Sequence, residues 1–170
     1  MSQRMRQFQE LVERYRKMVI RVVTGILGDP GMADDVAQEV FVKMYKNLDQ
    51  LGDPSAIPSW LYRVAVNQAI DMLRARERYR EEVLEDVISA EADPQMQIEK
   101  FEQAKFLHNA LDLLSTDHRV VLILRELEGR SYEEIANILS VPVGTVESRI
   151  ARARKALKNI LFVLVEKQNG

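Results

Sequence analysis

Basic side chains gather near the C-terminal end of this 170-residue sequence, in a stretch suited to contacting an acidic polymer. Between residues 143 and 158, five lysines and arginines stand against one acid, Glu147. An apolar stripe with steps of three and four residues predicts a helix, and its members are Val146, Ile150, Ala153 and Leu157. The opposite, open face then carries Thr145, Ser148, Arg149, Arg152 and Lys155. Such a helix fits the major groove of DNA, where side chains read base edges and cations contact phosphates.

The residues before this helix predict the scaffold that would position it. Ser131 followed by Glu134 matches the capping-box pattern, which predicts that a short helix begins there. Ser140-Val141-Pro142 then predicts a tight break. Two helices joined by a short turn make a helix-turn-helix, which we expect over residues 129–157. The alternative is an ordinary helical hairpin with a solvated basic face, since charged helix faces are common.

A second basic face is predicted in the first part of the chain, on a helix from about Ser59 to Tyr79. Its polar positions, at steps of three and four residues, are Arg63, Asn67, Asp71, Arg74 and Arg78. Trp60, the only tryptophan, lies at the start of this helix beside a loop over 51–59. A basic face with a nearby aromatic can hold a nucleic-acid strand and stack on a base. Alternatively, Trp60 belongs to the core and the arginines are simply solvated.

The helix before this one carries a third candidate surface, opposite an apolar stripe of Val36, Val40, Met44 and Leu48. The residues of this surface are Asp35, Gln38, Glu39, Phe41 and Val42. Acids beside exposed apolar groups can dock on a basic partner surface. The alternative is that the acids at 34 and 35 lie in the first turn and only stabilise the helix start.

Helical periodicity dominates the chain and predicts an all-α fold. From residue 81 to 102, eight acids stand against one lysine, which predicts a solvated acidic linker. We therefore expect two small helical domains, at 1–80 and 101–166, joined by a linker over 81–100. The positions expected to face inward in the second domain include Phe101, Leu107, Leu124 and Leu127.

Composition narrows the classes of function. The net charge is −2, so a case for nucleic acid depends on where the charges lie. The chain has no cysteine, no Gly-rich phosphate loop and no cluster of metal ligands, and its only histidines are His108 and His118. We therefore expect no catalytic residue, no metal and no cofactor. No signal segment or apolar run long enough to span a bilayer is visible, so we expect a cytoplasmic protein without membrane insertion.

Five segments in this order resemble the extracytoplasmic-function (ECF) sigma factors, the small two-domain sigma factors of bacterial RNA polymerase. The segments are Asp35–Phe41, Trp60–Asn67, Arg119–Glu126, Ser131–Ala136 and Val143–Arg154. The resemblance covers about residues 8–161. It implies an all-α protein with a sigma region 2 helical bundle and a sigma region 4 helix-turn-helix.

The resemblance also implies roles for particular residues. Contact with core RNA polymerase is implied for Asp35, Gln38 and Glu39. Recognition and opening of the −10 promoter element are implied for Leu51, Ile57, Trp60, Arg63 and Asn67. Recognition of the −35 element is implied for Thr145, Glu147, Ser148, Arg149, Arg152 and Lys155. Many relatives carry Lys or Arg at the position of Glu147, where an acid would repel phosphate or accept a hydrogen bond from a cytosine amino group.

The partners implied are promoter DNA, the clamp helices of the largest polymerase subunit and the flap of the second-largest subunit. An anti-sigma protein that covers both DNA-binding faces is a further expected partner. The alternative function is a DNA-binding regulator that never contacts polymerase and uses its first domain to sense a ligand or to dimerise. Mixing the chain with core polymerase separates the two hypotheses.

Overall fold

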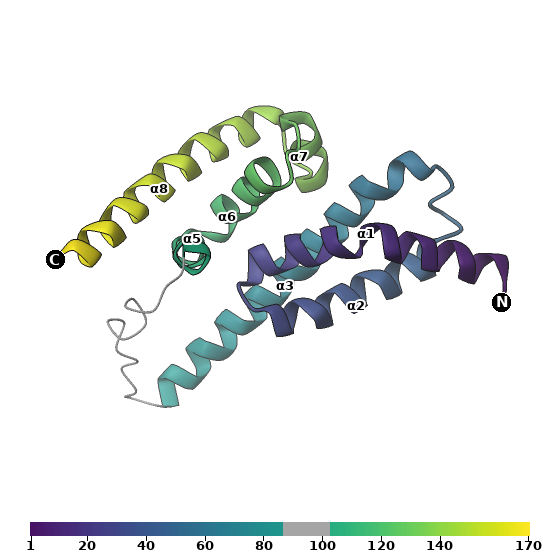
Figure 1. Ribbon diagram of the computed structural model, residues 1–170, viewed down its shortest axis with the longest axis horizontal. Helices are drawn as coiled ribbons and strands as arrows, with labels where there is room; N and C mark the ends of the chain where they lie inside the picture. The colour runs from purple at the N-terminus through teal and green to yellow at the C-terminus, as the bar shows by residue number, and fades with distance from the viewer. Residues whose placement is uncertain (87–102) are drawn as a thin grey trace.

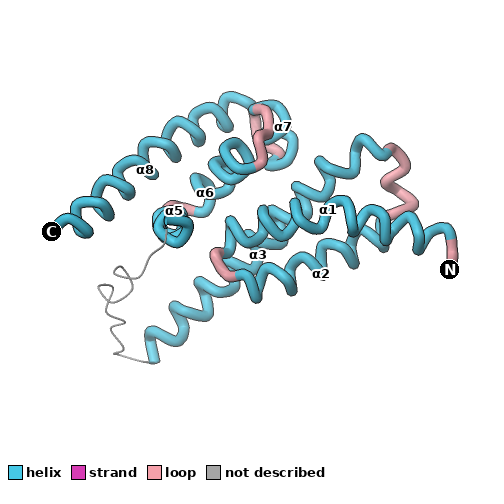
Figure 2. Tube along the Cα trace, viewed as in Figure 1, coloured by secondary structure: helices cyan, strands magenta, loops and turns pink. Residues whose placement is uncertain are grey.

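The computed structural model describes residues 1–86 (the first half) and 103–170 (the second half), and within these ranges it contains helices and no strand (Figures 1 and 2). The predicted all-α fold is therefore confirmed. The elements of the first half are α1 (Gln3–Leu27), α2 (Pro30–Asn47), the short 3₁₀ helix η1 (Pro54–Ala56) and α3 (Ile57–Asp86). Those of the second half are α5 (Gln103–Asp112), α6 (Thr116–Leu122), η2 (Ile123–Leu127), α7 (Tyr132–Leu139) and α8 (Val143–Asn169).

Local signals at the α1–α2 junction explain how the first half turns back on itself. α1 ends at Gly28, which has a positive φ of 71°, a conformation that costs glycine little. The Asp29 carboxylate then accepts hydrogen bonds from the backbone N–H groups of Gly31 and Met32, with Pro30 as first residue of α2. Asp29 therefore caps α2, and the prediction that the acids at 34 and 35 lie in its first turn is wrong.

The third helix of the first half is longer than predicted. α3 begins at Ile57 and ends at Asp86, seven residues beyond the expected end at Tyr79. The added residues include four Glu and Asp, of which glutamate is a good helix former. The acidic run that begins at Glu81 therefore starts within α3. Residues 87–102, which hold most of the predicted linker and Phe101, lie outside the described residues.

In the second half, two serines cap helices, and one of them, Ser131, does so where the sequence predicts. The Ser115 hydroxyl accepts a hydrogen bond from the backbone N–H of His118, and the Ser131 hydroxyl accepts one from that of Glu134. α7 and α8 are joined by a short turn in which Ser140 has φ 55°. The predicted helix-turn-helix is present, and α8 continues to Asn169.

One turn of the second half departs from the α-helical pattern. η2 is a π-helical turn, in which the N–H of Glu128 donates to the carbonyl of Ile123 five residues earlier. This wider turn shifts the helical phase by one residue, so Leu127 points outward and is 58% exposed, whereas Glu128 points inward. The prediction that Leu127 faces inward is therefore wrong. The same prediction for Leu107, in α5, is also wrong, since Leu107 is 41% exposed.

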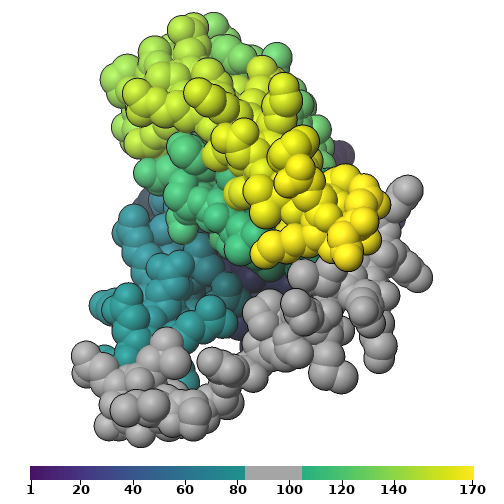
Figure 3. Space-filling model, turned by 90° about the vertical axis from the view of Figure 1, so that its left-hand side faces the viewer, coloured from purple at the N-terminus to yellow at the C-terminus, as the bar shows by residue number. Residues whose placement is uncertain are grey.

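The two halves lie against each other and share one continuous apolar core. In Figure 1 the second half lies along α1 and α3, with α7 beside α3. Figure 3 shows the green surface of the second half resting directly on the teal surface of α3. No helix in the described ranges combines the length and apolar character needed to cross a bilayer.

Candidate nucleic-acid interface

The helix-turn-helix holds α8 through the apolar stripe that the sequence predicts. Val146, Ile150 and Ala153 are buried to within 1% of full burial and pack into the core, with Leu157 partly buried beside them. The break before α8 is closed by the N–H of Val141, which donates to the carbonyl of Ala136. The orientation of α8 is therefore set by packing, which leaves its opposite side to solvent.

The open side of α8 carries the predicted polar residues, of which Glu147, Ser148, Arg152 and Lys155 are exposed and Thr145 and Arg149 are half-buried. Across the described ranges, neither Arg149 nor Arg152 forms an ion pair. Their guanidinium groups are therefore available to an anion. Arg154 differs, because its guanidinium binds Glu126 at 2.6 Å within the same half. The pKa of Arg154 is accordingly raised by this hydrogen bond.

The candidate residues around α3 do not all share one surface. Asn67 is exposed, and so are Asp71, Arg74 and Arg78 farther along the same helix. Trp60 and Leu51 are half-buried and pack against the core. Ile57 is only 3% exposed and belongs to the core, so its proposed contact with a base is not supported. Its apolar side chain is the first of α3 and belongs to the same buried cluster as Leu61.

Arg63 has a partner that the sequence did not predict. Its guanidinium donates to both the backbone carbonyl and the side-chain oxygen of Asn137 in α7, each at 3.1 Å. This contact joins the basic face of α3 to the first helix of the helix-turn-helix. In the described arrangement, Arg63 is therefore bound within the chain.

α2 forms a ridge between two hollows of the surface. Asp35, Gln38 and Glu39 are exposed on it, together with Val42, which is 52% exposed. Phe41 is 8% exposed, so the prediction that it lies on this open face is wrong. It turns instead toward α1, where a groove of about 490 Å³ is lined by residues that include Phe8, Val12, Gln38, Phe41 and Val42.

The second hollow lies on the other side of the ridge, toward α3, and has a volume of about 610 Å³. Its lining includes Asp35, Gln38, Glu39, Val42 and Met72. Gln38 and Val42 therefore line both hollows. The ridge therefore presents an apolar side chain, Val42, near the acids Asp35 and Glu39, with a groove on either side. A helical partner can dock on such a surface.

Comparison with known proteins identifies the family. The family model for Sigma-70 region 2 matches residues 11–79, and that for Sigma-70 region 4 matches residues 107–157. The RNA polymerase sigma-H factor of Pseudomonas aeruginosa is 39% identical over 171 residues, which cover 94% of this chain and 89% of that protein. The ECF RNA polymerase sigma-E factor of Escherichia coli K12 is 38% identical, again over 94% of this chain and 89% of that protein. The chain belongs to the ECF sigma factors.

Solved structures share the fold of this ECF sigma factor. CnrH, in complex with the cytosolic domain of CnrY, superposes with a TM-score of 0.70 and 29% identity over 94% of this chain and 90% of that one. The sigma factor RpoE of Bartonella quintana, in complex with the anti-sigma factor NepR, superposes with a TM-score of 0.73 and 24% identity. The match covers 92% of this chain and 98% of that one. This ECF sigma factor is thus a transcription initiation factor rather than an enzyme.

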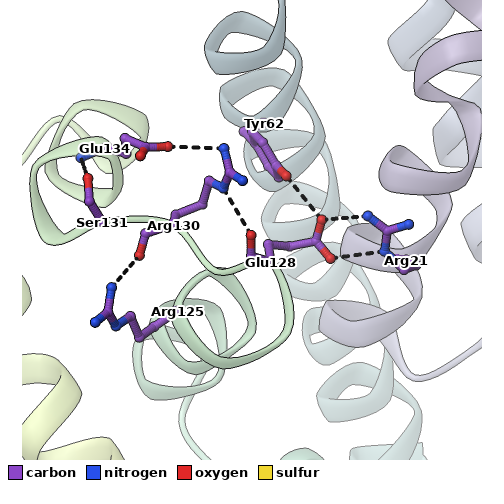
Figure 4. Close-up of polar contacts among 7 residues, drawn as sticks. All are labelled: Arg21, Tyr62, Arg125, Glu128, Arg130, Ser131 and Glu134. Atoms are coloured by element: carbon purple, nitrogen blue, oxygen red, sulfur yellow. Dashed lines mark hydrogen bonds and ion pairs between the residues drawn. The ribbon is translucent and has the colours of Figure 1, made fainter.

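A cluster between the two halves of this ECF sigma factor was missed by the sequence analysis (Figure 4). Glu128 follows the π turn, and its side chain is only 1% exposed. Its carboxylate accepts two hydrogen bonds from the Arg21 guanidinium, at 2.9 and 3.0 Å, and one from the Tyr62 hydroxyl at 3.0 Å. Burial, and then the negative charge of Glu128, raise the pKa of Tyr62 to about 12.

Proposed function

We propose that the chain binds core RNA polymerase through the α2 ridge and reads promoters at two places, the −10 element with α3 and the −35 element with α8. The observation that carries this proposal is a pair of guanidinium groups, those of Arg149 and Arg152, which form no ion pair within residues 1–86 and 103–170 and lie on the open side of a packed helix-turn-helix. Arginine can donate two hydrogen bonds to a guanine edge or bind a phosphate.

For the −35 element, we assign Thr145, Glu147, Ser148, Arg149, Arg152 and Lys155. These residues lie in the N-terminal part of α8, the part that enters the groove in helix-turn-helix proteins. The Ser148 hydroxyl donates to the carbonyl of Thr145 at 3.0 Å, so it can still accept from a base. For the −10 element we assign Asn67 and Arg63, with Trp60 and Leu51 at the edge of the loop.

For core polymerase we assign Asp35, Gln38 and Glu39, and we add Val42 because it is the exposed apolar centre of the ridge. The expected counterparts are the clamp helices of the largest subunit for α2 and the flap of the second-largest subunit for the second half. Action on polymerase also implies a cytoplasmic location. Each DNA contact alone is weak, and polymerase holds the two halves so that the second contact is effectively intramolecular.

The test is reconstitution with purified core polymerase. We expect a stable complex at moderate salt and, on fragmented genomic DNA, transcripts whose 5′ ends share one upstream pair of elements. Arg149→Ala should weaken promoter binding by about 1–3 kcal/mol if it contacts a base. Arg154→Ala is the matched control, because it removes the same charge from the same helix at a side chain already paired with Glu126.

The α2 ridge has its own matched pair of variants. Glu39→Lys should abolish assembly with core polymerase, whereas Glu13→Lys makes the same charge change at an exposed position of α1 and should not. If the wild-type chain forms no complex with core polymerase, the proposal is wrong, and a promoter-specific regulator that acts without polymerase becomes the better hypothesis.

We further propose control by an anti-sigma protein. CnrH and RpoE of Bartonella quintana are described in complex with partners of which NepR is named an anti-sigma factor. Such a protein would compete for the α2 ridge or for the basic faces. Co-purification of a specific inhibitor that prevents assembly with core polymerase tests this part of the proposal.

A further inference from the structure

The contact between the two halves contains a buried charge, the carboxylate of Glu128. The Glu128 carboxylate accepts three hydrogen bonds from the first half: two from Arg21 and one from Tyr62. Figure 4 shows the carboxylate of Glu128 between the two donors. A buried carboxylate needs such partners, since without them its desolvation is costly. We call this set of three residues the Glu128 latch.

The backbone of the second half is shaped to present this carboxylate. The π turn rotates Glu128 into the place where an α-helix would have put Leu127. π turns interrupt helices at functional sites more often than elsewhere. Arg130, two residues on, lies over the Tyr62 ring at 5.4 Å, and its Nε donates to the backbone carbonyl of Glu128.

A close apolar approach lies beside the latch. A Cβ added to Gly25 of α1 would be 3.0 Å from Cδ1 of Ile123, and the three nearest atoms would all belong to Ile123. Gly25 therefore leaves room on α1 for the π turn of the second half. A glycine inside a helix costs about 1 kcal/mol relative to alanine, so a packing reason for it is expected here.

The arrangement cannot read both promoter elements at once. The −35 and −10 elements are about 25 base pairs apart, which at about 3.4 Å per base pair is roughly 85 Å of duplex. Arg63 contacts Asn137 at 3.1 Å, and Arg149 follows Asn137 by twelve residues. Twelve residues reach at most about 43 Å even when fully extended. The two DNA-reading surfaces must therefore separate before a promoter is bound.

We propose that the Glu128 latch holds the free factor in a closed, promoter-incompetent state, and that the halves must undock at Arg21, Tyr62 and Glu128 before both elements are read. That the closed state is incompetent rests on the proposed function, in which the factor contacts two promoter elements. In the closed state, Arg63 is bound to Asn137 and is withheld from DNA. Any partner that requires the open state binds with an affinity reduced by the closed fraction.

The latch is suited to release. Arg21 is 58% exposed at its side chain, so its charge returns to water with little reorganisation when the halves part. An ion pair that is partly exposed is also weakened by salt.

The experiment measures the distance between the halves in the full chain. The sequence has no cysteine, so Glu13→Cys on α1 and Glu133→Cys on α7 give two unique, exposed sites for spin labels. We expect one narrow distance in the parent protein. Arg21→Ala, Glu128→Ala and Gly25→Leu should each add a long-distance population and move the closed–open equilibrium by about tenfold or more, which corresponds to about 1.4 kcal/mol.

Three features of the design keep the result interpretable. Arg21→Ala and Gly25→Leu alter the first half on the side facing the latch, so a folding defect of the helix-turn-helix does not explain their effect. Glu126→Ala is the control, because Glu126 lies in the same turn as Glu128 but binds Arg154 of its own half. Arg21→Ala combined with Glu128→Ala should open the chain little more than either change alone.

Binding of labelled factor to core polymerase is the second measurement. Opening variants should bind core polymerase up to about tenfold more tightly than the parent, as the closed fraction is removed. Distances and affinities that stay unchanged in all three variants would overturn the latch, even if the holoenzyme forms. If the distances respond but no variant binds core polymerase, the latch stands as a domain contact, and its regulatory role falls together with the proposed function.

Discussion

Replacing Arg119 tests whether backbone carbonyls at the junction of the two halves depend on one buried cation. Arg119 is 5% exposed, and its guanidinium donates to four carbonyls. Three belong to the end of α5 and the turn that follows it: Leu111 at 2.8 Å, Asp112 at 3.0 Å and Leu114 at 3.2 Å. The fourth is that of Ile26 at the end of α1, at 2.7 Å. One side chain therefore satisfies the ends of two helices in different halves.

Two opposing effects decide the size of the loss in Arg119→Met. Each buried carbonyl left without a donor costs about 1–3 kcal/mol. Three of the four hydrogen bonds are buried, and of their carbonyls that of Leu111 keeps a second donor, the N–H of Leu114 at 3.1 Å. Against this, methionine removes the cost of burying a cation, a cost that also lowers the pKa of Arg119. We expect the loss of the hydrogen bonds to outweigh the removal of the buried charge, with a net fall of about 2–4 kcal/mol in the free energy of unfolding.

The assay is urea unfolding followed by circular dichroism at 222 nm, with the slope of the transition compared between proteins. Arg119→Lys should fall between wild type and Arg119→Met, because an ammonium keeps the charge but reaches fewer of the carbonyls. Arg74→Met, at an exposed position, should change stability by less than about 0.5 kcal/mol. A loss below about 1 kcal/mol in Arg119→Met would refute the reasoning.

Three other predictions use different parts of the structure. Gly28→Ala should destabilise the chain by about 1–2 kcal/mol in thermal unfolding, because φ is +71° and the added Cβ would lie 2.8 Å from the Asp112 carboxylate; a stabilised variant would contradict this. Tyr62→Phe should remove a pH effect: the wild-type protein keeps the phenol proton up to about pH 12, whereas the unfolded chain loses it near 10, so wild-type stability falls between these values by up to roughly 2–3 kcal/mol. Unfolding curves of the two proteins that run parallel from pH 9 to 12 would disprove the assignment. Glu147→Arg should strengthen binding to nonspecific duplex and steepen its salt dependence by about one phosphate contact, and an unchanged slope in a fluorescence titration would place this side chain away from the DNA backbone.

The sequence by itself determined the helices, their order and the family. Apolar residues at steps of three and four set the buried face of α8, because an α-helix brings such positions to one side whatever it packs against. Ser131 began its helix where expected, because a cap depends only on backbone groups two or three residues away. The exposed residues of the α2 ridge and of α8 follow from the same local periodicity.

Only the tertiary structure decided which of these residues are free and which are already bound. Phe41 and Ile57 turned inward because neighbouring helices offered apolar surface that no local pattern reveals. Glu128 turned inward because a single π turn shifted the helical phase, and its partner Arg21 lies 107 residues away in the chain. Periodicity carries information over one or two turns of helix, whereas a buried ion pair depends on atoms brought together by packing between distant segments. That difference in range is why the sequence indicated a two-part DNA-binding factor, and why the contact that holds its parts together was visible only in three dimensions.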